Sequence, residues 1–268
     1  MIIPPSFVNL SDLETLYVDG SARVLLPDTL WDMKKLRHLG GTSMWVLPSL
    51  IPVANLENLL TLSEVEISSC QIRIGVLKKL PNLRSLICYL DMDGECTVEF
   101  FTLNQLESLF VRSSHSILSG LYLPQSLKER SLLWIGLPLS EVSAIERLPS
   151  LEFLKLSYSS FSGEKWNMEE EGTFPKLNVL EIKLMVSLER WTTASDDNFP
   201  SIETLILNDC PRLEEIPSCI AQSSTLQMIK VNDCPRVINS IKEIHEMQMD
   251  LGNEDRRIYL NDQPLTKE

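Results

Sequence analysis

The segment Phe199-Pro-Ser-Ile202-Glu-Thr-Leu205-Ile-Leu207-Asn-Asp-Cys210-Pro-Arg-Leu213 contains the pattern that decides the fold. Counted from Ile202, aliphatic residues occupy its first, fourth and sixth positions. Side chains alternate along a β-strand, so the fourth and sixth positions point to the same face. The segment therefore predicts a short strand with one apolar face.

The same pattern occurs ten times along the chain, and successive copies start 21 to 26 residues apart. This spacing falls within the roughly 20 to 29 residue period of leucine-rich repeats. One such strand buries too little apolar surface to fold alone, whereas stacked copies share a continuous core. The copies start at Leu13, Leu36, Leu62, Leu83, Leu106, Leu127, Leu151, Leu177, Ile202 and Leu226.

The periodicity predicts an α/β fold, a leucine-rich-repeat solenoid or horseshoe. We expect a concave parallel sheet of about ten strands and an irregular convex side of loops and short helical turns. Leu26-Pro27, Leu47-Pro48 and Ile216-Pro217 begin several of the return segments. Proline has no backbone donor, so these segments are not expected to form a second regular sheet.

Two copies depart from the pattern. Arg130 occupies a core position, where burying an unpaired charge would cost several kcal/mol. We therefore expect a local bulge there, or a guanidinium that bends out to water along its aliphatic stem. In the copy that starts at Leu36, the sixth position is Gly41, which adds no apolar side chain to the core.

The repeats cover most of the 268 residues, which favours a single domain over 1–268. Residues 1–12 resemble the remnant of a preceding repeat, so the first strand is expected to expose its edge. Repeats follow over 13–235. Residues 236–268 are predicted to form a C-terminal cap, with a capping box at Ser240 and Glu243, a helix near 241–251 and an extended segment over 258–260.

Composition excludes several classes of partner. The net charge of −13 argues against nucleic acid, which is bound through clustered Lys and Arg. The sequence contains neither a secretory signal pattern nor a run of about 18 apolar residues, so we expect a cytoplasmic protein with no membrane span. Cys70, Cys210 and Cys234 fall on the ninth repeat position, and free buried thiols fit a reducing compartment.

No arrangement of residues indicates catalysis. His38, His115 and His245 lie in different parts of the repeat series, without the close Cys or carboxylate spacing of a metal site. A phosphate-binding Gly-x4-Gly-Lys-Ser/Thr loop is absent. We expect neither an enzyme nor a catalytic, metal or cofactor site in this chain, and no small-molecule substrate.

The candidate site is the row of outward positions, the third, fifth and seventh of each copy, which would line the concave face. Aromatic residues and arginine often anchor protein interfaces. In the alternative interpretation these side chains only pack against cross-strand neighbours. The candidate protein-binding residues are Tyr17, Ile87, Tyr89, Phe110, Arg112, Phe153, Lys155 and Lys183; Lys230 occupies an equivalent position.

A longer repeat contains the acidic segment Glu164-Lys-Trp166-Asn-Met-Glu-Glu-Glu171. We expect a solvated loop with Trp166 folded back over the core. The alternative is an acidic docking patch for a basic surface of the same parent protein.

Several stretches resemble one family of repeats. They include Leu26-Pro-Asp-Thr-Leu-Trp31, Leu148-Pro-Ser-Leu-Glu-Phe153 and the Cys-Pro-x-Leu motif at Cys210, which recurs at Cys234 with Val237 in place of Leu. These residues are similar to the repeat region of plant nucleotide-binding leucine-rich-repeat immune receptors. The resemblance is in particular to the coiled-coil class of the late blight resistance type from nightshade plants.

The resemblance implies a sensor and autoinhibitory module for disease resistance. Its implied partners are the receptor's own nucleotide-binding domain and a pathogen effector or guarded host protein. ADP or ATP would bind only in that nucleotide-binding domain, and the parent receptor could bring the chain to a membrane or to the nucleus.

A second functional class is also compatible with the sequence. The substrate-receptor part of a ubiquitin ligase also presents intracellular leucine-rich repeats with cysteine in the turn. An extracellular receptor is disfavoured, because the sequence has no signal pattern and lacks a regular Asn-x-x-Gly-x-Ile-Pro motif.

Overall fold

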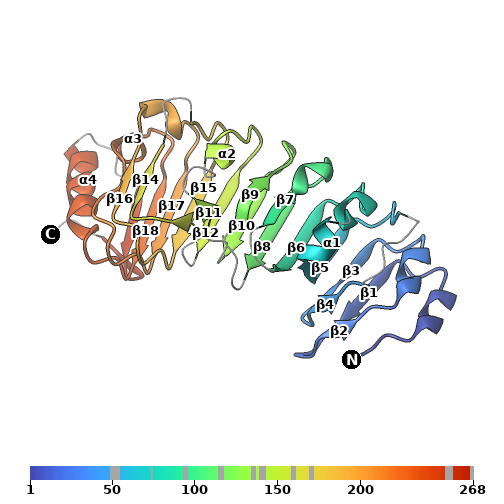
Figure 1. Cartoon of the computed structure of the whole chain (residues 1–268). Coiled ribbons are helices and arrows are strands. Elements are labelled where there is room, and N and C mark those ends of the chain that lie inside the picture. Colours follow the sequence, from blue (N-terminus) through green and yellow to red (C-terminus); the bar gives the residue numbers. More distant parts are fainter. Residues whose placement is uncertain are drawn as a thin grey trace. The chain divides into compact units, whose positions relative to one another are not determined.

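The structure is a computed structural model that describes residues 1–48, 55–73, 75–92, 96–113, 118–133, 137–138, 143–157, 161–168, 172–250 and 256–265. The chain divides into two compact units, Met1–Leu127 and Lys128–Glu268. Each unit is built around a sheet of parallel strands with short return segments between them (Figure 1). The prediction of a single domain remains a prediction.

In unit 1 the main sheet has the order β1-β3-β5-β6-β8, and every pair in it is parallel. Its strands are β1 (Thr15–Val18), β3 (His38–Gly41), β5 (Thr61–Ser68), β6 (Ser85–Asp91) and β8 (Ser108–Ser113). The return segments contain η1 (Pro5–Asn9), β2 (Val24–Leu25), η2 (Asp28–Asp32), β4 (Trp45–Val46), α1 (Ser69–Arg73), η3 (Val76–Lys79), β7 (Cys96–Glu99), η4 (Phe100–Thr102) and β9 (Leu118–Tyr122).

In unit 2 the main sheet has the order β10-β12-β15-β17-β18-β19-β20, parallel except for the last pair. Its strands are β10 (Glu129–Leu133), β12 (Phe153–Ser157), β15 (Val179–Lys183), β17 (Thr204–Asn208), β18 (Met228–Asn232), β19 (Arg257–Leu260) and β20 (Gln263–Pro264). The connections contain β11 (Leu137–Pro138), α2 (Ser143–Glu146), β13 (Phe161–Ser162), β14 (Lys165–Asn167), β16 (Arg190–Thr192), η6 (Asp196–Asn198), α3 (Ser218–Ala221) and α4 (Ile238–Asp250).

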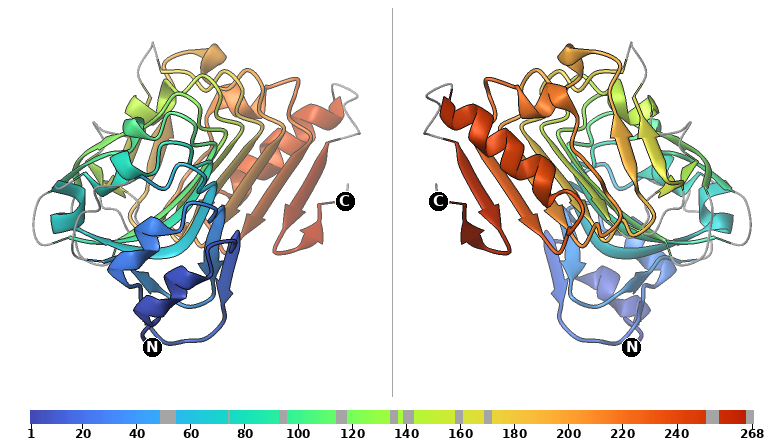
Figure 2. Two further views of the ribbon diagram at one scale, coloured as in Figure 1. Left: turned by 90° about the vertical axis from the view of Figure 1, so that its right-hand side faces the viewer. Right: turned by 90° about the vertical axis from the view of Figure 1, so that its left-hand side faces the viewer.

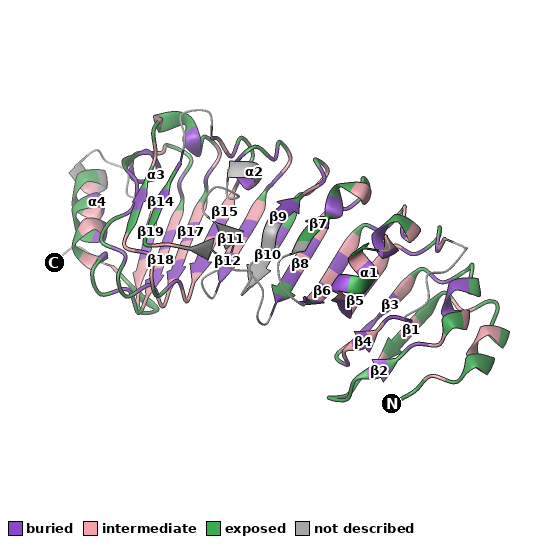
Figure 3. Ribbon diagram, viewed as in Figure 1, coloured by how far each residue is buried: buried purple, intermediate pink, exposed green. Residues whose placement is uncertain are grey.

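The predicted apolar columns form the core of both units. In β17, Leu205 and Leu207 are fully buried, whereas Thr204, Ile206 and Asn208 between them are only partly buried. The same alternation of buried and partly buried residues recurs in β6, β15 and β18 (Figure 3). The parallel sheet and the period-two division of its strands are therefore confirmed.

One repeat was placed in the wrong register from the sequence. Leu62 pairs with Leu39 and Leu86, so it occupies the fourth position of its copy and the copy starts at Leu59. The strand then bulges between Leu62 and Val65, where Glu64 has a φ of 56°. Counted from Leu62, the fourth and sixth positions are Val65 and Ile67, whereas counted from Leu59 the sixth position is Glu64, which is why the sequence pattern favoured the wrong start.

The first strand has the exposed edge that the sequence predicted. β1 pairs with β3, and its inward residues Leu16 and Val18 are only half-buried, whereas Leu39 in β3 is buried. Gly41 closes β3 with a φ of 148°. A Cβ atom at Gly41 would collide with the carbonyl group of Val18, so the absence of a side chain permits this close approach.

The return segments contain the predicted short helical turns. They also form short parallel pairs: β2–β4 joins the main sheet of unit 1 through β5, whereas β7–β9, β11–β13 and β14–β16 are separate two-stranded sheets. Trp166 of β14 is buried and stacks on Trp191 of β16, with ring centroids 5.0 Å apart. Its indole Nε1 donates to Glu146 at 3.1 Å. Trp166 therefore folds over the core as expected, but Lys165–Asn167 forms the paired strand β14 where a loop was predicted. Residues 169–171 of the acidic segment lie outside the described residues.

Two predictions from the sequence, one for Arg130 and one for Cys70, are wrong. Arg130 pairs with Leu154 without a register shift and is only 1% exposed, so it neither causes a bulge nor reaches water. Cys70 lies exposed in α1 rather than in a turn at the ninth repeat position. Cys210 and Cys234 are buried free thiols at successive turns, as predicted.

The C-terminal helix begins earlier than predicted. α4 starts at Ile238, so Ser240 lies inside the helix and does not cap it. Ile241 and Ile244 are buried, whereas Leu251 and Gly252 lie outside the described residues. α4 connects β18 to β19, which extends the sheet by a further parallel strand (Figure 2).

Candidate protein-interaction surface

The outward positions of the main strands form one face of each sheet, which we term the open strand face. Of the candidate residues, Tyr17, Ile87, Tyr89, Phe110 and Arg112 lie on this face in unit 1. Phe153, Lys155 and Lys183 lie on it in unit 2.

In unit 1 the structure brings four candidates together on β6 and β8. Ile87 lies beside Phe110, and Tyr89 lies beside Arg112. The Arg112 guanidinium carbon is 5.7 Å from the centre of the Phe110 ring, within the range of a cation–π interaction. We call these four residues the aromatic–arginine cluster. Arg112 is exposed and the other three are partly exposed, so all four can be reached from solvent.

Tyr17 lies apart from this cluster. It pairs with Gly40 of β3, and two strands, β3 and β5, separate β1 from β6. Because its cross-strand neighbour has no side chain, Tyr17 remains 63% exposed. It is thus available for contact but does not belong to the aromatic–arginine cluster.

An ion pair beside the cluster was missed from the sequence. Glu66 of β5 pairs in register with Tyr89 and accepts a hydrogen bond from Arg23. This bond and the charge of Glu66 raise the pKa of Arg23 above its usual value. Glu66 is only 8% exposed, so the carboxylate at the edge of the cluster is buried and already paired with an arginine.

In unit 2 the candidates are more polar. Lys155 of β12 lies beside Glu181 of β15, with Nζ 2.7 Å from Oε1. Both side chains are more than two-thirds buried, at 28% and 15% exposure. Phe153 lies two residues before Lys155 on the same face of β12, beside Val179. Lys155 is therefore engaged in an internal ion pair and is less available to a partner than the sequence suggested.

Lys183 lies at the edge of a polar hollow of about 310 Å³ at the ends of β15, β17, β18 and β19. Asparagine side chains connect successive repeats there. Asn232 donates to Asn208 Oδ1 at 3.0 Å and accepts from the backbone of Asp262 at 3.0 Å. Lys230 pairs with Asp262 at 2.7 Å, and this interaction lowers the pKa of Asp262.

The hydrogen-bonded asparagines of successive repeats, Asn208 and Asn232, which we term the asparagine ladder, belong to a tetrapeptide that the sequence repeats. Asn-Asp-Cys-Pro occurs twice, at Asn208 and at Asn232. In both copies the following aspartate, Asp209 or Asp233, has a positive φ, which Asn and Asp tolerate better than most residues. The repeated tetrapeptide therefore predicts a turn, but only the structure shows that its side chains bond between repeats.

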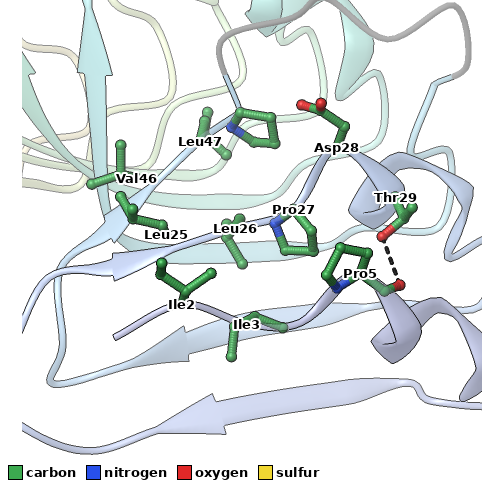
Figure 4. A pocket seen from close by; sticks show the side chains of 11 residues that line it. Ile2, Ile3, Pro5, Leu25, Leu26, Pro27, Asp28, Thr29, Val46 and Leu47 are labelled. Atoms are coloured by element: carbon green, nitrogen blue, oxygen red, sulfur yellow. Dashed lines mark hydrogen bonds between the residues drawn. The ribbon is translucent and has the colours of Figure 1, made fainter.

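A second hollow, of about 540 Å³, lies among the return segments of unit 1 (Figure 4). Ile2, Leu25 and Val46 follow one another across neighbouring strands and form its aliphatic floor. Ile2 is 70% exposed and Leu25 is 44% exposed. Asp28 also lines the hollow.

The described residues provide neither a metal site nor a membrane span. Within the described ranges, no three His, Cys, Asp or Glu side chains gather in an arrangement that could hold a metal ion. In the same part of the chain, no helix is long and apolar enough to cross a membrane.

Comparison with known proteins places these features in a family. The chain is 35% identical over 274 residues to a putative late blight resistance protein homolog of Solanum demissum, covering 92% of this chain and 20% of that protein. It is 34% identical over 280 residues to late blight resistance protein R1-A of the same plant, covering 99% of this chain and 21% of that protein. The chain thus spans about one fifth of the length of these relatives.

The family described as leucine-rich repeat region matches residues 2–211, which include nine of the ten predicted copies and the aromatic–arginine cluster. The repeated strands, the buried aliphatic columns and this match agree, and the chain belongs to the leucine-rich repeat family.

Proposed function

We propose that this chain is the recognition and regulatory module of a plant intracellular immune receptor. The observation that carries the proposal is the similarity, over 92% or more of the chain, to proteins named for late blight resistance. These relatives also favour an immune receptor over the ubiquitin-ligase alternative. In this proposal the module acts by binding proteins in the cytoplasm, without catalysis and without a cofactor of its own.

The aromatic–arginine cluster is the best candidate for the recognition surface. Aromatic residues and arginine contribute large contact area and directed hydrogen bonds, and they are enriched at the centres of protein interfaces. Phe110 holds Arg112 in place through the cation–π contact, which reduces the conformational entropy lost on binding. Ile87 and Tyr89 extend the same accessible area over β6.

Regulation requires the module to distinguish two states of the receptor. We propose that the open strand face contacts the nucleotide-binding domain of the parent receptor in its resting state. A pathogen effector or a guarded host protein would then bind the active state more tightly, and this difference in affinity shifts the equilibrium. ADP or ATP would be held by the nucleotide-binding domain, outside this chain.

The test is a double substitution in the full-length protein that carries this chain. Phe110→Ala with Arg112→Ala removes the anchor of the cluster. The control, Phe101→Ala with Arg73→Ala, makes the same chemical change at two exposed residues of η4 and α1 in the same unit.

Both variants are expressed in leaf tissue with secreted proteins of the blight pathogen, and cell death is scored. Loss of the pathogen-dependent response, or cell death without the pathogen, is expected for the first variant only. Unchanged responses for both, at equal protein levels, would contradict the assignment of recognition or autoinhibition to this cluster.

A further inference from the structure

Arg130 is a charged residue inside an aliphatic column of unit 2. It lies in β10 and pairs in register with Leu154, and the column continues through Leu180, Leu205 and Ile229. These four neighbours are fully buried, and Arg130 itself is 1% exposed. The side chain therefore occupies a core position that the other strands fill with leucine or isoleucine.

The guanidinium group of Arg130 lacks the partners that normally accompany a buried charge. Within the described structure, its Nε, Nη1 and Nη2 atoms make no hydrogen bond. Burial lowers the pKa of Arg130 to about 9, so the group still carries its charge at neutral pH. Leaving such a group buried and unpaired is strongly unfavourable, because the interior does not replace its lost hydration.

Arg256 shows how the same side chain is accommodated elsewhere in unit 2. It is partly buried, but it donates to the carbonyl oxygens of Leu226, Ala221 and Ser223 at distances of 3.0, 2.8 and 2.6 Å. In the part of the chain that the structure describes, burial thus coincides with three acceptors at Arg256 and with none at Arg130. The unfavourable energy is concentrated in β10.

The energetic penalty at Arg130 acts first on the strand that contains it, β10. Strands and helices of one protein open with different free energies, and a strand with an internal penalty opens more easily than its neighbours.

We propose that Arg130 makes β10 a two-state element that exchanges between a closed form paired with β12 and an open form in which the guanidinium is hydrated. The closed form is the one in the structure, where the amides of Glu152 and Phe153 donate to the carbonyl of Lys128 at 2.8 and 3.0 Å. A ligand or domain that binds one form better shifts the population toward it. This exchange between a closed and an open form is a property of β10 and does not depend on the proposed immune function.

Hydrogen–deuterium exchange of the unmodified chain tests the proposal directly. The amides of β10 and β12 that join the two strands are expected to exchange at least about tenfold faster than those of β17, whose core positions are the aliphatic residues Leu205 and Leu207. Exchange in β10 as slow as in β17 would overturn the proposal.

Substitution tests the role of the charge. Arg130→Met keeps a long side chain without the charge and is expected to slow exchange in β10 and β12 by at least about tenfold. Arg130→Lys retains a charge and should leave exchange fast. Arg190→Met makes the same change at an exposed arginine of β16 and should leave β10 unaffected.

Unchanged exchange in folded Arg130→Met protein would also overturn the proposal. If Arg130→Met protein does not fold, Arg130→Leu replaces it, and the comparison of β10 with β17 in the unmodified chain stands independently.

Discussion

Replacing Leu205 with alanine is expected to lower the free energy of unfolding of unit 2 by about 3 kcal/mol. Leu205 is fully buried in β17, between Leu180 of β15 and Ile229 of β18. Each buried methylene removed costs about 0.8 kcal/mol, and the cavity left in a close-packed column adds to this loss. Neighbouring strands are tied by backbone hydrogen bonds, so the column cannot collapse fully into the space.

Thermal unfolding followed by circular dichroism measures this effect. A loss of about 3 kcal/mol corresponds to a fall of about 6 to 12 °C in Tm for a chain of this size. The control is Ile206→Ala, which removes a similar group from the neighbouring outward position, where the side chain is only partly buried. That change should cost about 1 kcal/mol or less. An equal or larger loss for Ile206→Ala would refute the period-two division of strands into core and open strand face.

Three further predictions concern particular contacts. A double-mutant cycle on Lys155 and Glu181 should give a coupling energy of about 1 to 2 kcal/mol in urea unfolding, because the pair is close and mostly buried. A coupling energy of zero at low salt would show that this ion pair does not stabilise the fold. Gly41→Ala should lower the free energy of unfolding by at least about 2 kcal/mol in the same assay, since the new methyl group would collide with the Val18 carbonyl. An unchanged urea midpoint would contradict this close approach. Asn232→Ala should cost about 1 to 2 kcal/mol through loss of its bonds to neighbouring repeats, whereas a neutral result would show that the asparagine ladder contributes no net stability.

The sequence predicted the features that follow from regular periodicity. Inward residues such as Leu180 and Leu207 must recur at fixed positions, because each repeat buries its apolar face against the next. The same logic placed Ile87, Tyr89, Phe110 and Arg112 on the outward face. That Phe110 and Arg112 contact each other depends on their rotamers, which the pattern does not specify.

Features that depend on an irregular register or on contacts between repeats were not predicted. The bulge after Leu62 adds a residue to that copy, so the aliphatic spacing fits a start at Leu62 better than the actual start at Leu59. Glu66 pairs with Arg23 across 43 positions, in a return segment whose path the pattern does not determine. Arg130 was expected to avoid burial, but the regular pairing of β10 with β12 places it in the core.

Site-specific photo-crosslinking in the full-length protein tests the central claim most directly. A photo-reactive phenylalanine is placed at position 110 in the aromatic–arginine cluster or at position 101 in η4, where Phe101 is 50% exposed. If the cluster is the recognition surface, position 110 should crosslink to the nucleotide-binding domain proposed as its partner or to a pathogen or host protein, and position 101 should not. Crosslinks from position 101 alone, or equal products from both positions, would contradict the account.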